Sequence, residues 1–239
     1  MNDFYVVIPS RLDSKRLARK ALALIDGKPL IQWVYHRAIA SKAKSVIIAT
    51  DSEEIASVAR SFGAIVELTN EDHKSGTDRI FEVCDRLNWD DDQVVVNLQG
   101  DNPLMPPENI NQIAQMMNDC DIATLSAPIQ DHEIIDPNVV KVSTDPSSND
   151  ALFFKRNINS GDFKKNLGRH IGIYAYNVAS LKRFSLSPQS EDEKKEKLEQ
   201  LRAYSLDMRI KVEQAQLIPG PDVDTQDDLK LVQSILQND

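Results

Sequence analysis

The chain has no long apolar run. Its 239 residues contain no stretch of about 20 successive apolar side chains, the length that a membrane-spanning helix needs. The first residues, MNDFYVVIPSR, also lack the basic start and apolar stretch of a secretory signal. Cysteine is scarce: Cys84 and Cys120 lack metal-ligand spacing, and we interpret them as reduced structural thiols. These absences lead us to expect a cytoplasmic protein without membrane insertion.

Basic charge is in the minority. Lys and Arg number 28 against 37 Asp and Glu, so the formal net charge is -9. This balance argues against a dedicated nucleic-acid binder, which spreads basic charge over a whole face. No linker rich in Gly, Ser or Pro and no internal repeat divides the chain, so we expect one domain over residues 1–239.

Short β-branched runs alternate with helical patterns in the first half. The runs are FYVVIPS (4–10), SVIIAT (45–50), AIVEL (64–68) and QVVVNLQ (93–99). They are almost continuously apolar, which predicts an α/β fold with a mainly parallel central sheet and helices on both faces. After residue 121, the runs DIATLSAPI, VVKVST, ALFFKR and HIGIYAY predict a small antiparallel extension.

Capping signals place the helices between these runs. We expect helices after Pro29, after the cap signal Asp51–Ser52 with Gly63 at the end, after Thr77, and after the cap signal Asp224–Thr225. Ligands of parallel sheets bind beyond the carboxyl ends of the strands. The loops that follow the strands should therefore carry the chemistry.

The first such loop is basic. It reads RLDSKRLARKAL (11–22) and contains no glycine, so the side chains of Arg11, Arg16 and Lys20 would have to neutralise a phosphate group. A solvated basic turn is the alternative. The position directly after the first strand favours phosphate binding.

A carboxylate stands in the loop of VVVNLQGDNPLMPP (94–107). Gly100 allows a tight turn there, and Asp101 follows at the edge of the sheet with Gln99 and Asn102 beside it. Such a carboxylate can hold Mg²⁺ against phosphate oxygens, although a simple Asx turn is the alternative. Asp224 is a second carboxylate that either binds the metal or caps the last helix.

Two further segments carry candidate binding residues. In EDHKSGTDR (71–79), Ser75, Gly76 and Thr77 offer hydrogen bonds to a base or ribose at the start of a helix, or they form an ordinary capping loop. In GRHIGIYAY, His170 precedes an apolar strand, where a lone histidine is more often structural than catalytic.

Taken together, these segments resemble the 3-deoxy-manno-octulosonate (Kdo) cytidylyltransferases. The similar segments run in family order from residue 8 to residue 229: IPSRLDSKRLARKAL, DGKPLI, ATDSEEI, DHKSGTDR, VNLQGDNP, RHIGIYAY, LEQLR and VDTQDDL. The resemblance implies a Rossmann-like nucleotidyltransferase fold, a homodimer, and a Mg²⁺-dependent reaction. That reaction joins CTP to an eight-carbon acid sugar, releases pyrophosphate, and serves lipopolysaccharide assembly in a Gram-negative cytoplasm.

The resemblance also assigns roles by position. It implies that Arg11, Arg16 and Lys20 hold the CTP phosphates, that Ser75 and Gln99 contact cytidine, that His73 and Gly76 shape that loop, and that Asp101 and Asp224 bind the metal. Lys20, Arg16 and Asp101 would be catalytic. The acid sugar would lie against Gln99, Arg156, His170, Tyr174, Glu199 and Gln200. Residues 1–120 would form the CTP-binding half, 121–215 the sugar-binding and dimerisation part, and 216–239 the metal-ligand loop and last helix.

The sequence departs from the family at four places. The usual RLPGK reads Arg16-Leu17-Ala18-Arg19-Lys20, GDEP reads GDNP with Asn102 in place of a carboxylate, and FSR reads Phe154-Lys155-Arg156. The apolar helix before LEQLR has become the charged SEDEKKEKLEQLR, 190–202. We therefore consider an acceptor with an 8-amino group, which Glu193 or Glu196 would pair with if they face the pocket. The alternative is a solvated charged helix.

Three other functions stay open. A cytidylyltransferase for another acid sugar, such as the sialic acid type, shares the basic loop, but DHKSGTDR and LEQLR favour the Kdo type. The GDNP change allows a CTP-binding sensor without catalysis. A purely structural interaction protein leaves the spacing of the polar loops unexplained.

Overall fold

The computed structural model describes residues 3–14, 16–158 and 166–237. Its main sheet has nine strands. They are β1 (Phe4–Ser10), β4 (Ser45–Thr50), β5 (Ile65–Leu68), β6 (Val94–Leu98), β7 (Ile122–Ala127), β8 (Lys141–Thr144), β9 (Ala151–Lys155), β10 (Asn166–Asn177) and β11 (Ile210–Gln214). A separate two-stranded sheet pairs β2 (Leu24–Ile25) with β3 (Lys28–Pro29).

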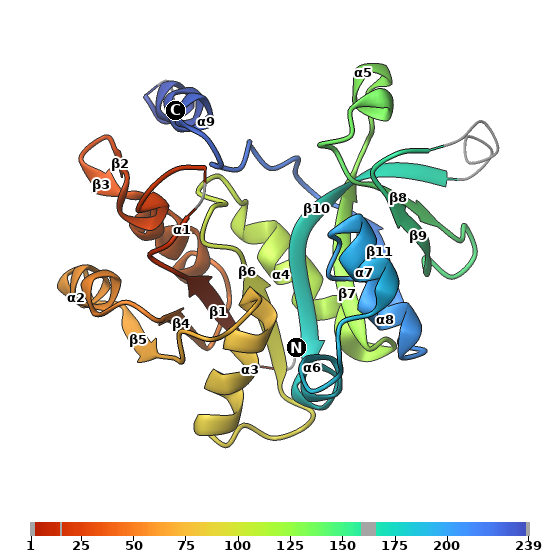
Figure 1. The fold of residues 1–239 in the computed structure, drawn as a ribbon, viewed down its shortest axis with the longest axis horizontal. Helices are drawn as coiled ribbons and strands as arrows, with labels where there is room; N and C mark the ends of the chain where they lie inside the picture. The colour runs from red at the N-terminus through yellow and green to blue at the C-terminus, as the bar shows by residue number, and fades with distance from the viewer. Residues whose placement is uncertain (1–2, 15, 159–165, 238–239) are drawn as a thin grey trace.

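The main sheet runs in the order β11-β7-β10-β6-β1-β4-β5. Strands β6, β1, β4 and β5 are parallel to one another, and β11 is parallel to β7. The long strand β10 is antiparallel to both neighbours, and β8 and β9 extend the sheet from its first part (Figure 1). The mainly parallel sheet with an antiparallel extension that the sequence predicts is thus confirmed.

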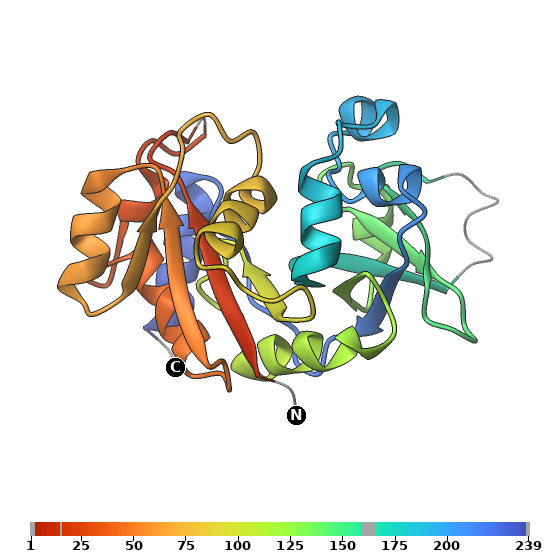
Figure 2. The same cartoon turned by 90° about the horizontal axis from the view of Figure 1, so that it is seen from below.

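Helices cover both faces of this sheet (Figures 1 and 2). They are α1 (Leu30–Ile39), α2 (Glu53–Ser61), α3 (Gly76–Arg86), α4 (Pro107–Gln115), α5 (Asp131–Ile135), α6 (Val178–Ser185), α7 (Glu191–Glu196), α8 (Leu201–Ser205) and α9 (Gln226–Leu236), with short 3-10 turns η1 (Lys20–Leu22) and η2 (Met116–Asn118). None of the helices in the described part of the chain is both long and apolar enough to cross a membrane.

The alternation of side chains in β1 explains the two-sided core. Val6 and Ile8 point to the face that packs against α1 and α4, and Val7 points to the opposite face with α3 and α6. All three are fully buried. Because successive side chains of a strand point to opposite faces, an unbroken apolar run can pack against helices on both sides.

The predicted helix caps are largely confirmed. The Ser52 hydroxyl accepts a hydrogen bond from the N–H of Ile55 at 3.3 Å, and α2 ends before Gly63, which has a φ of +88°. The last helix starts as predicted, but Thr225 is its cap: its hydroxyl accepts from the N–H of Asp228. The side chain of Asp224 is therefore available for other contacts.

The charged segment 190–202 and the residues that follow it form two short helices, α7 and α8. Lys197 lies between them in the left-handed region, with a φ of +54°, which ends α7 after six residues. The alternative interpretation of a solvated charged helix holds for most of α7, where Glu191 pairs with Lys194 in an exposed position. Glu193 is the exception, because it is 4% exposed.

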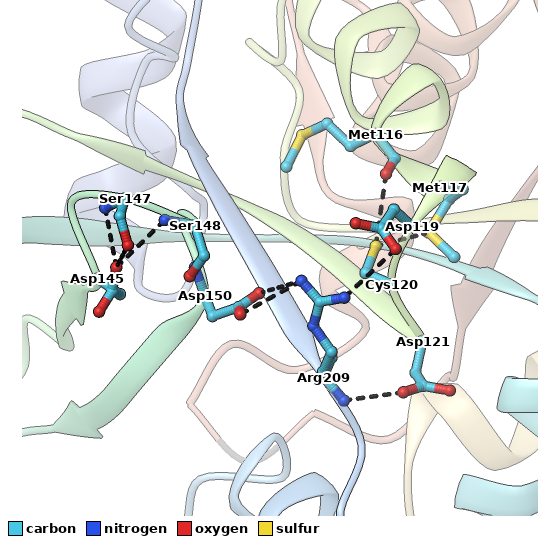
Figure 3. A network of polar contacts seen from close by, with 10 residues as sticks. All are labelled: Met116, Met117, Asp119, Cys120, Asp121, Asp145, Ser147, Ser148, Asp150 and Arg209. Atoms are coloured by element: carbon cyan, nitrogen blue, oxygen red, sulfur yellow. Dashed lines mark hydrogen bonds and ion pairs between the residues drawn. The ribbon is translucent and has the colours of Figure 1, made fainter.

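The sequence analysis missed strand β11, which completes the edge beside β7. Figure 3 shows how its start is held: the guanidinium of Arg209 contacts Asp119 at 3.3 Å and Asp150 at 3.0 Å, and its backbone N–H donates to Asp121 at 2.8 Å. These contacts join the loop after β8 to the start of β7.

Candidate functional site

A polar pocket of about 450 Å³ opens beyond the carboxyl ends of β1 and β6. The loops that follow these two parallel strands meet the N-terminus of α3 there, as the rule for parallel sheets predicts. Its lining includes all of the predicted CTP and metal residues: Arg11, Arg16, Lys20, His73, Ser75, Gly76, Gln99, Asp101 and Asp224. Glu199 is the one predicted sugar residue, apart from Gln99, that also lines it.

Lys20 joins the two predicted metal carboxylates. Its Nζ lies 2.8 Å from Oδ2 of Asp101 and 3.0 Å from Oδ1 of Asp224. The other oxygen of Asp224 lies 2.8 Å from Nη2 of Arg16. Residues separated by up to 204 positions in the sequence therefore converge on a single ammonium group.

These contacts keep Lys20 charged. Burial works against the ammonium form, but the charges and hydrogen bonds of Asp101 and Asp224 outweigh it and raise the pKa of Lys20 above its ordinary value. A positive charge thus occupies the point between the carboxylates.

The same two carboxylates fit a magnesium ion. One cation already contacts an oxygen of each, so both can reach a common centre. Mg²⁺ is typically bound by one or two carboxylates together with substrate phosphates and water. Within residues 3–14, 16–158 and 166–237, no cluster of three or more His, Cys, Asp or Glu is arranged as a complete metal site. Phosphate oxygens would have to supply the remaining ligands.

The N-terminus of α3 forms the opposite wall. Ser75 caps this helix: its hydroxyl accepts a hydrogen bond from the N–H of Asp78 at 3.1 Å. The ring of His73 is hydrogen-bonded to the carboxylate of Glu82, which lies one helical turn after Asp78. A Cβ built on Gly76 would lie 3.0 Å from Cγ of Pro9, so the start of the helix packs closely against β1 and a larger residue here would require Pro9 to shift.

The amide of Gln99 is held in place by its neighbour in β6. Its Nε2 donates to Oδ1 of Asn97 at 2.8 Å. The Oε1 atom therefore points away from this bond and lies 3.6 Å from the position of a Cβ on Gly76. Gln99 lines the pocket, and its Oε1 is an acceptor to which a base amine could donate.

The sequence analysis missed Arg79, which also lines the pocket. It is 3% exposed, donates to Oδ2 of Asp51 at 2.6 Å, and contacts the hydroxyl of Thr69. It therefore ties the loops after β4 and β5 to α3. Its position on the apolar face of α3, one residue before Ile80, was the available signal.

Glu199 extends the site toward the predicted sugar side. Its Oε2 accepts from the hydroxyl of Thr77 at 3.0 Å, while Oε1 is buried and has no hydrogen-bond partner among the described residues. Burial raises the pKa of Glu199, and the nearby hydroxyls of Ser75 and Thr77 only partly oppose this. A donor group of a ligand could satisfy Oε1.

The other predicted sugar residues lie outside the pocket lining. The ring of His170 lies 5.5 Å from that of Tyr174 and receives or gives a hydrogen bond with Oγ1 of Thr124 at 3.0 Å. Burial, followed by the charge of Glu199, raises the pKa of Tyr174. Arg156 donates to backbone carbonyls, including that of Glu196, and Gln200 is buried. Their sugar-binding roles stay predictions.

Glu193 does not face the pocket. Its two carboxylate oxygens accept from Nε and Nη2 of Arg202, so this side chain already has a cationic partner. Neither Glu193 nor Glu196 lines the pocket. The hypothesis that Glu193 pairs with an amino group of the acceptor is therefore wrong.

Comparison with known proteins identifies the family. The family model described as "Cytidylyltransferase" matches residues 5–210. The chain belongs to the cytidylyltransferase family. Two curated relatives of this cytidylyltransferase, both named 3-deoxy-manno-octulosonate cytidylyltransferase, come from Thioalkalivibrio sulfidiphilus and Francisella tularensis subsp. holarctica. They are 44% and 46% identical to it, and each alignment covers 98% of this chain and 99% of the relative.

Solved structures agree with this assignment. A structure of CMP:2-keto-3-deoxy-manno-octonic acid synthetase complexed with CTP superposes with a TM-score of 0.90 at 36% identity, and covers 99% of both chains. A 4-diphosphocytidyl-2C-methyl-D-erythritol synthase, at 11% identity and a TM-score of 0.69, shares the fold alone. The nucleotidyltransferase fold and enzyme class that the sequence predicts are thus confirmed.

Proposed function

We propose that this enzyme transfers CMP from CTP to the anomeric hydroxyl of 3-deoxy-manno-octulosonate and releases pyrophosphate, with Mg²⁺ as its metal. The observation that carries the proposal is the convergence of Asp101 and Asp224 on the Nζ of Lys20, at 2.8 and 3.0 Å. A cationic side chain and two carboxylates at the carboxyl end of a parallel sheet are the groups that nucleotidyl transfer is expected to need. The names of the full-length relatives support this acceptor.

The chain's own residues supply charge and position. Arg11, Arg16 and Lys20 line the side of the pocket that receives the triphosphate. Mg²⁺, bound by Asp101 and Asp224, would neutralise phosphate charge and orient the α-phosphate. Lys20, whose ammonium contacts both carboxylates, would present its charge to the phosphate oxygens. No covalent protein nucleophile is required, because positioning and charge neutralisation do most of the work.

The pocket offers one unpartnered polar atom that could contact the acceptor sugar. The unpartnered Oε1 of Glu199 accepts a donor, either a hydroxyl of the sugar or an ammonium group. An 8-amino sugar is therefore a second candidate acceptor, supported by Glu199 and no longer by Glu193. A sialic acid is a third, and the names of the relatives speak against it.

Pyrophosphate release tests the proposal directly. The purified enzyme is given CTP and Mg²⁺ with 3-deoxy-manno-octulosonate, its 8-amino analogue, or a sialic acid. We expect release with the first sugar. Release only with the 8-amino sugar would make Glu199 a site of ammonium selection. If the protein binds CTP but releases no pyrophosphate with any of the three sugars, it would be a CTP-binding sensor without catalysis.

A matched pair of variants connects the reaction to the site. Asp224→Asn should abolish most of the release, because one metal ligand loses its charge. Asp227→Asn is the control: this residue lies on the exposed face of α9, where it pairs with Lys230 at 3.2 Å. Equal loss in both variants would show that the last helix, and not a metal ligand, is the sensitive feature.

A homodimer in the cytoplasm completes the proposal. Light scattering during size-exclusion chromatography measures the mass directly, and a monomer of 26.9 kDa would contradict the dimer. Fractionation of cells that express the tagged chain tests the compartment.

A further inference from the structure

The segment that carries Asp224 has little structure of its own. Residues 215–225 connect β11 to α9 without forming a helix or strand. At the start, Asn109 fixes the segment: its side chain accepts from the N–H of Leu217 at 3.1 Å and donates to the carbonyl of Leu217 at 2.7 Å. At the end, Thr225 caps α9. The position of Asp224 therefore depends on what the intervening residues contact.

Three contacts attach this segment to the loop after β6. A Cβ built on Gly220 would lie 2.5 Å from Cδ1 of Leu104, so the backbone approaches that side chain closely. The N–H of Val223 donates to the carbonyl of Asp101 at 2.9 Å. Between them, Nδ2 of Asn102 donates to Oδ1 of Asp222. The last contact is the only one of the three that joins two polar side chains.

Asn102 is well placed to hold its partner. It is 4% exposed, and its own backbone is fixed because its N–H donates to the carbonyl of Gln99 at 3.2 Å. Asp222, by contrast, lies on the exposed side of the segment. The buried, fixed amide thus donates a hydrogen bond to a carboxyl oxygen of the less regular segment.

We propose that Asn102 and Asp222 act as a clamp that positions Asp224 opposite Asp101, so that both carboxylates reach one cation. Asn102 and Asp222 are positioning residues: neither contacts Lys20, and each stands next to or two residues from one of the aspartates that do. The clamp acts through its hydrogen bond and does not act as a third negative charge at the site. This inference rests on the proposed Mg²⁺ site.

The two possible roles of the pair predict opposite results for the same substitutions. Asn102→Asp places a carboxylate against that of Asp222. If the hydrogen bond matters, the repulsion opens the clamp and weakens cation binding. If the negative charge matters, the added charge strengthens it. Asp222→Asn keeps an acceptor oxygen and removes the charge. It should therefore leave cation binding nearly unchanged if the hydrogen bond matters, and weaken cation binding if the negative charge matters.

The measurement is the Mg²⁺ concentration that gives half-maximal CTP binding, determined by equilibrium dialysis without acceptor sugar. Alkaline pH is used, so that two adjacent carboxyls do not share a proton. For Asn102→Asp we expect this concentration to rise about 10-fold or more, as for other residues that orient metal ligands. The exchanged pair, Asn102→Asp with Asp222→Asn, should recover most of the loss because an amide again faces a carboxylate.

Asn138 and Asp136 provide a matched control. Nδ2 of Asn138 donates to Oδ1 of Asp136 at 3.0 Å in an exposed loop away from the pocket lining. Asn138→Asp adds the same charge and should leave the Mg²⁺ requirement unchanged. Melting temperatures without Mg²⁺ show whether each variant is folded.

Each outcome decides between the models. An unchanged or lower Mg²⁺ requirement in Asn102→Asp overturns the clamp, as does a failure of the exchanged pair to recover. If parent enzyme binds CTP without any need for Mg²⁺, the proposed metal site fails together with the clamp. If only the clamp variants behave like parent while Asp224→Asn loses Mg²⁺ dependence, the metal site stands and the clamp fails.

Discussion

The carboxylate of Glu193 and the guanidinium of Arg202 form a two-point ion pair in the protein interior. The distances are 2.9 Å from Nε to Oε2 and 2.7 Å from Nη2 to Oε1. Arg202 also lies over the ring of Phe184, and Asp78 is 3.9 Å away. This pair joins α7 to α8 across the break at Lys197, and so holds the turn that carries Glu199.

Removing Glu193 should therefore cost stability. Glu193→Ala leaves the guanidinium of Arg202 buried with the Phe184 carbonyl at 3.3 Å and the more distant Asp78 as its remaining partners. Breaking such a pair costs about 3–5 kcal/mol. Urea unfolding followed by circular dichroism measures the change. Glu191→Ala, which removes an exposed pair with Lys194, should change the free energy of unfolding little, because solvent screens that pair. Equal losses in the two variants would contradict a special role for the buried pair.

The left-handed backbone conformation of Arg19 leads to a second prediction. It has a φ of +55°, in the left-handed region, and its side chain pairs with Glu54. A side chain costs roughly 1–2 kcal/mol in this region, so Arg19→Gly should be more stable than Arg19→Ala by about 1 kcal/mol. At Arg60, within α2, the order should reverse because glycine weakens a helix interior. Thermal unfolding of the four variants decides the sign at each position.

His170 should make the fold sensitive to acid. Burial lowers its pKa from 6.5 to about 3. Between these two values the unfolded chain binds a proton that the folded chain does not, so stability falls as the pH falls from about 6.5. His170→Gln removes this contribution, and its free energy of unfolding should decline less steeply over that interval. Identical slopes for parent and variant in urea titrations at several pH values would show that His170 titrates normally.

Lys141 is a buried lysine with a structural task. It is fully buried, and its Nζ donates to the carbonyl of Asp136 and, at 2.7 Å, to that of Arg156. Lys141→Met should lower the free energy of unfolding by about 1–3 kcal/mol, because those carbonyls lose their donor. Lys182→Met, at an exposed position, should change it little. A stabilised Lys141→Met variant would show that burying the ammonium costs more than its two bonds contribute.

Part of the pocket lining was predictable because its residues follow parallel strands directly. Arg11 comes after β1 and Asp101 after β6, so their side chains had to meet at one edge of the sheet. Asp224 follows no strand and precedes a helix, so local pattern alone could not separate a metal ligand from a cap. The resemblance to a family was needed to choose, and Thr225 is the cap.

What the sequence could not predict depends on partners far along the chain. Glu193 looks like one more charge in a polar segment until Arg202 is seen to bind it. Asp222 looks like a turn residue until the amide of Asn102 is found beside it. Strand β11 carried a weak signal. Apolar Ile210 and Val212 alternate with charged Lys211 and Glu213, which is the period of a half-buried strand, but five residues are too few to decide.

Strand β10 connects two parts of the sheet that have different partners. Its last five residues, 173–177, are paired with β6, whereas its first four, 166–169, are paired with β8. Its pairing with β7 shifts register between these two parts. A substitution in the β8–β9 arm therefore acts first on the pairing of residues 166–169 and leaves the hydrogen bonds between 173–177 and β6 in place.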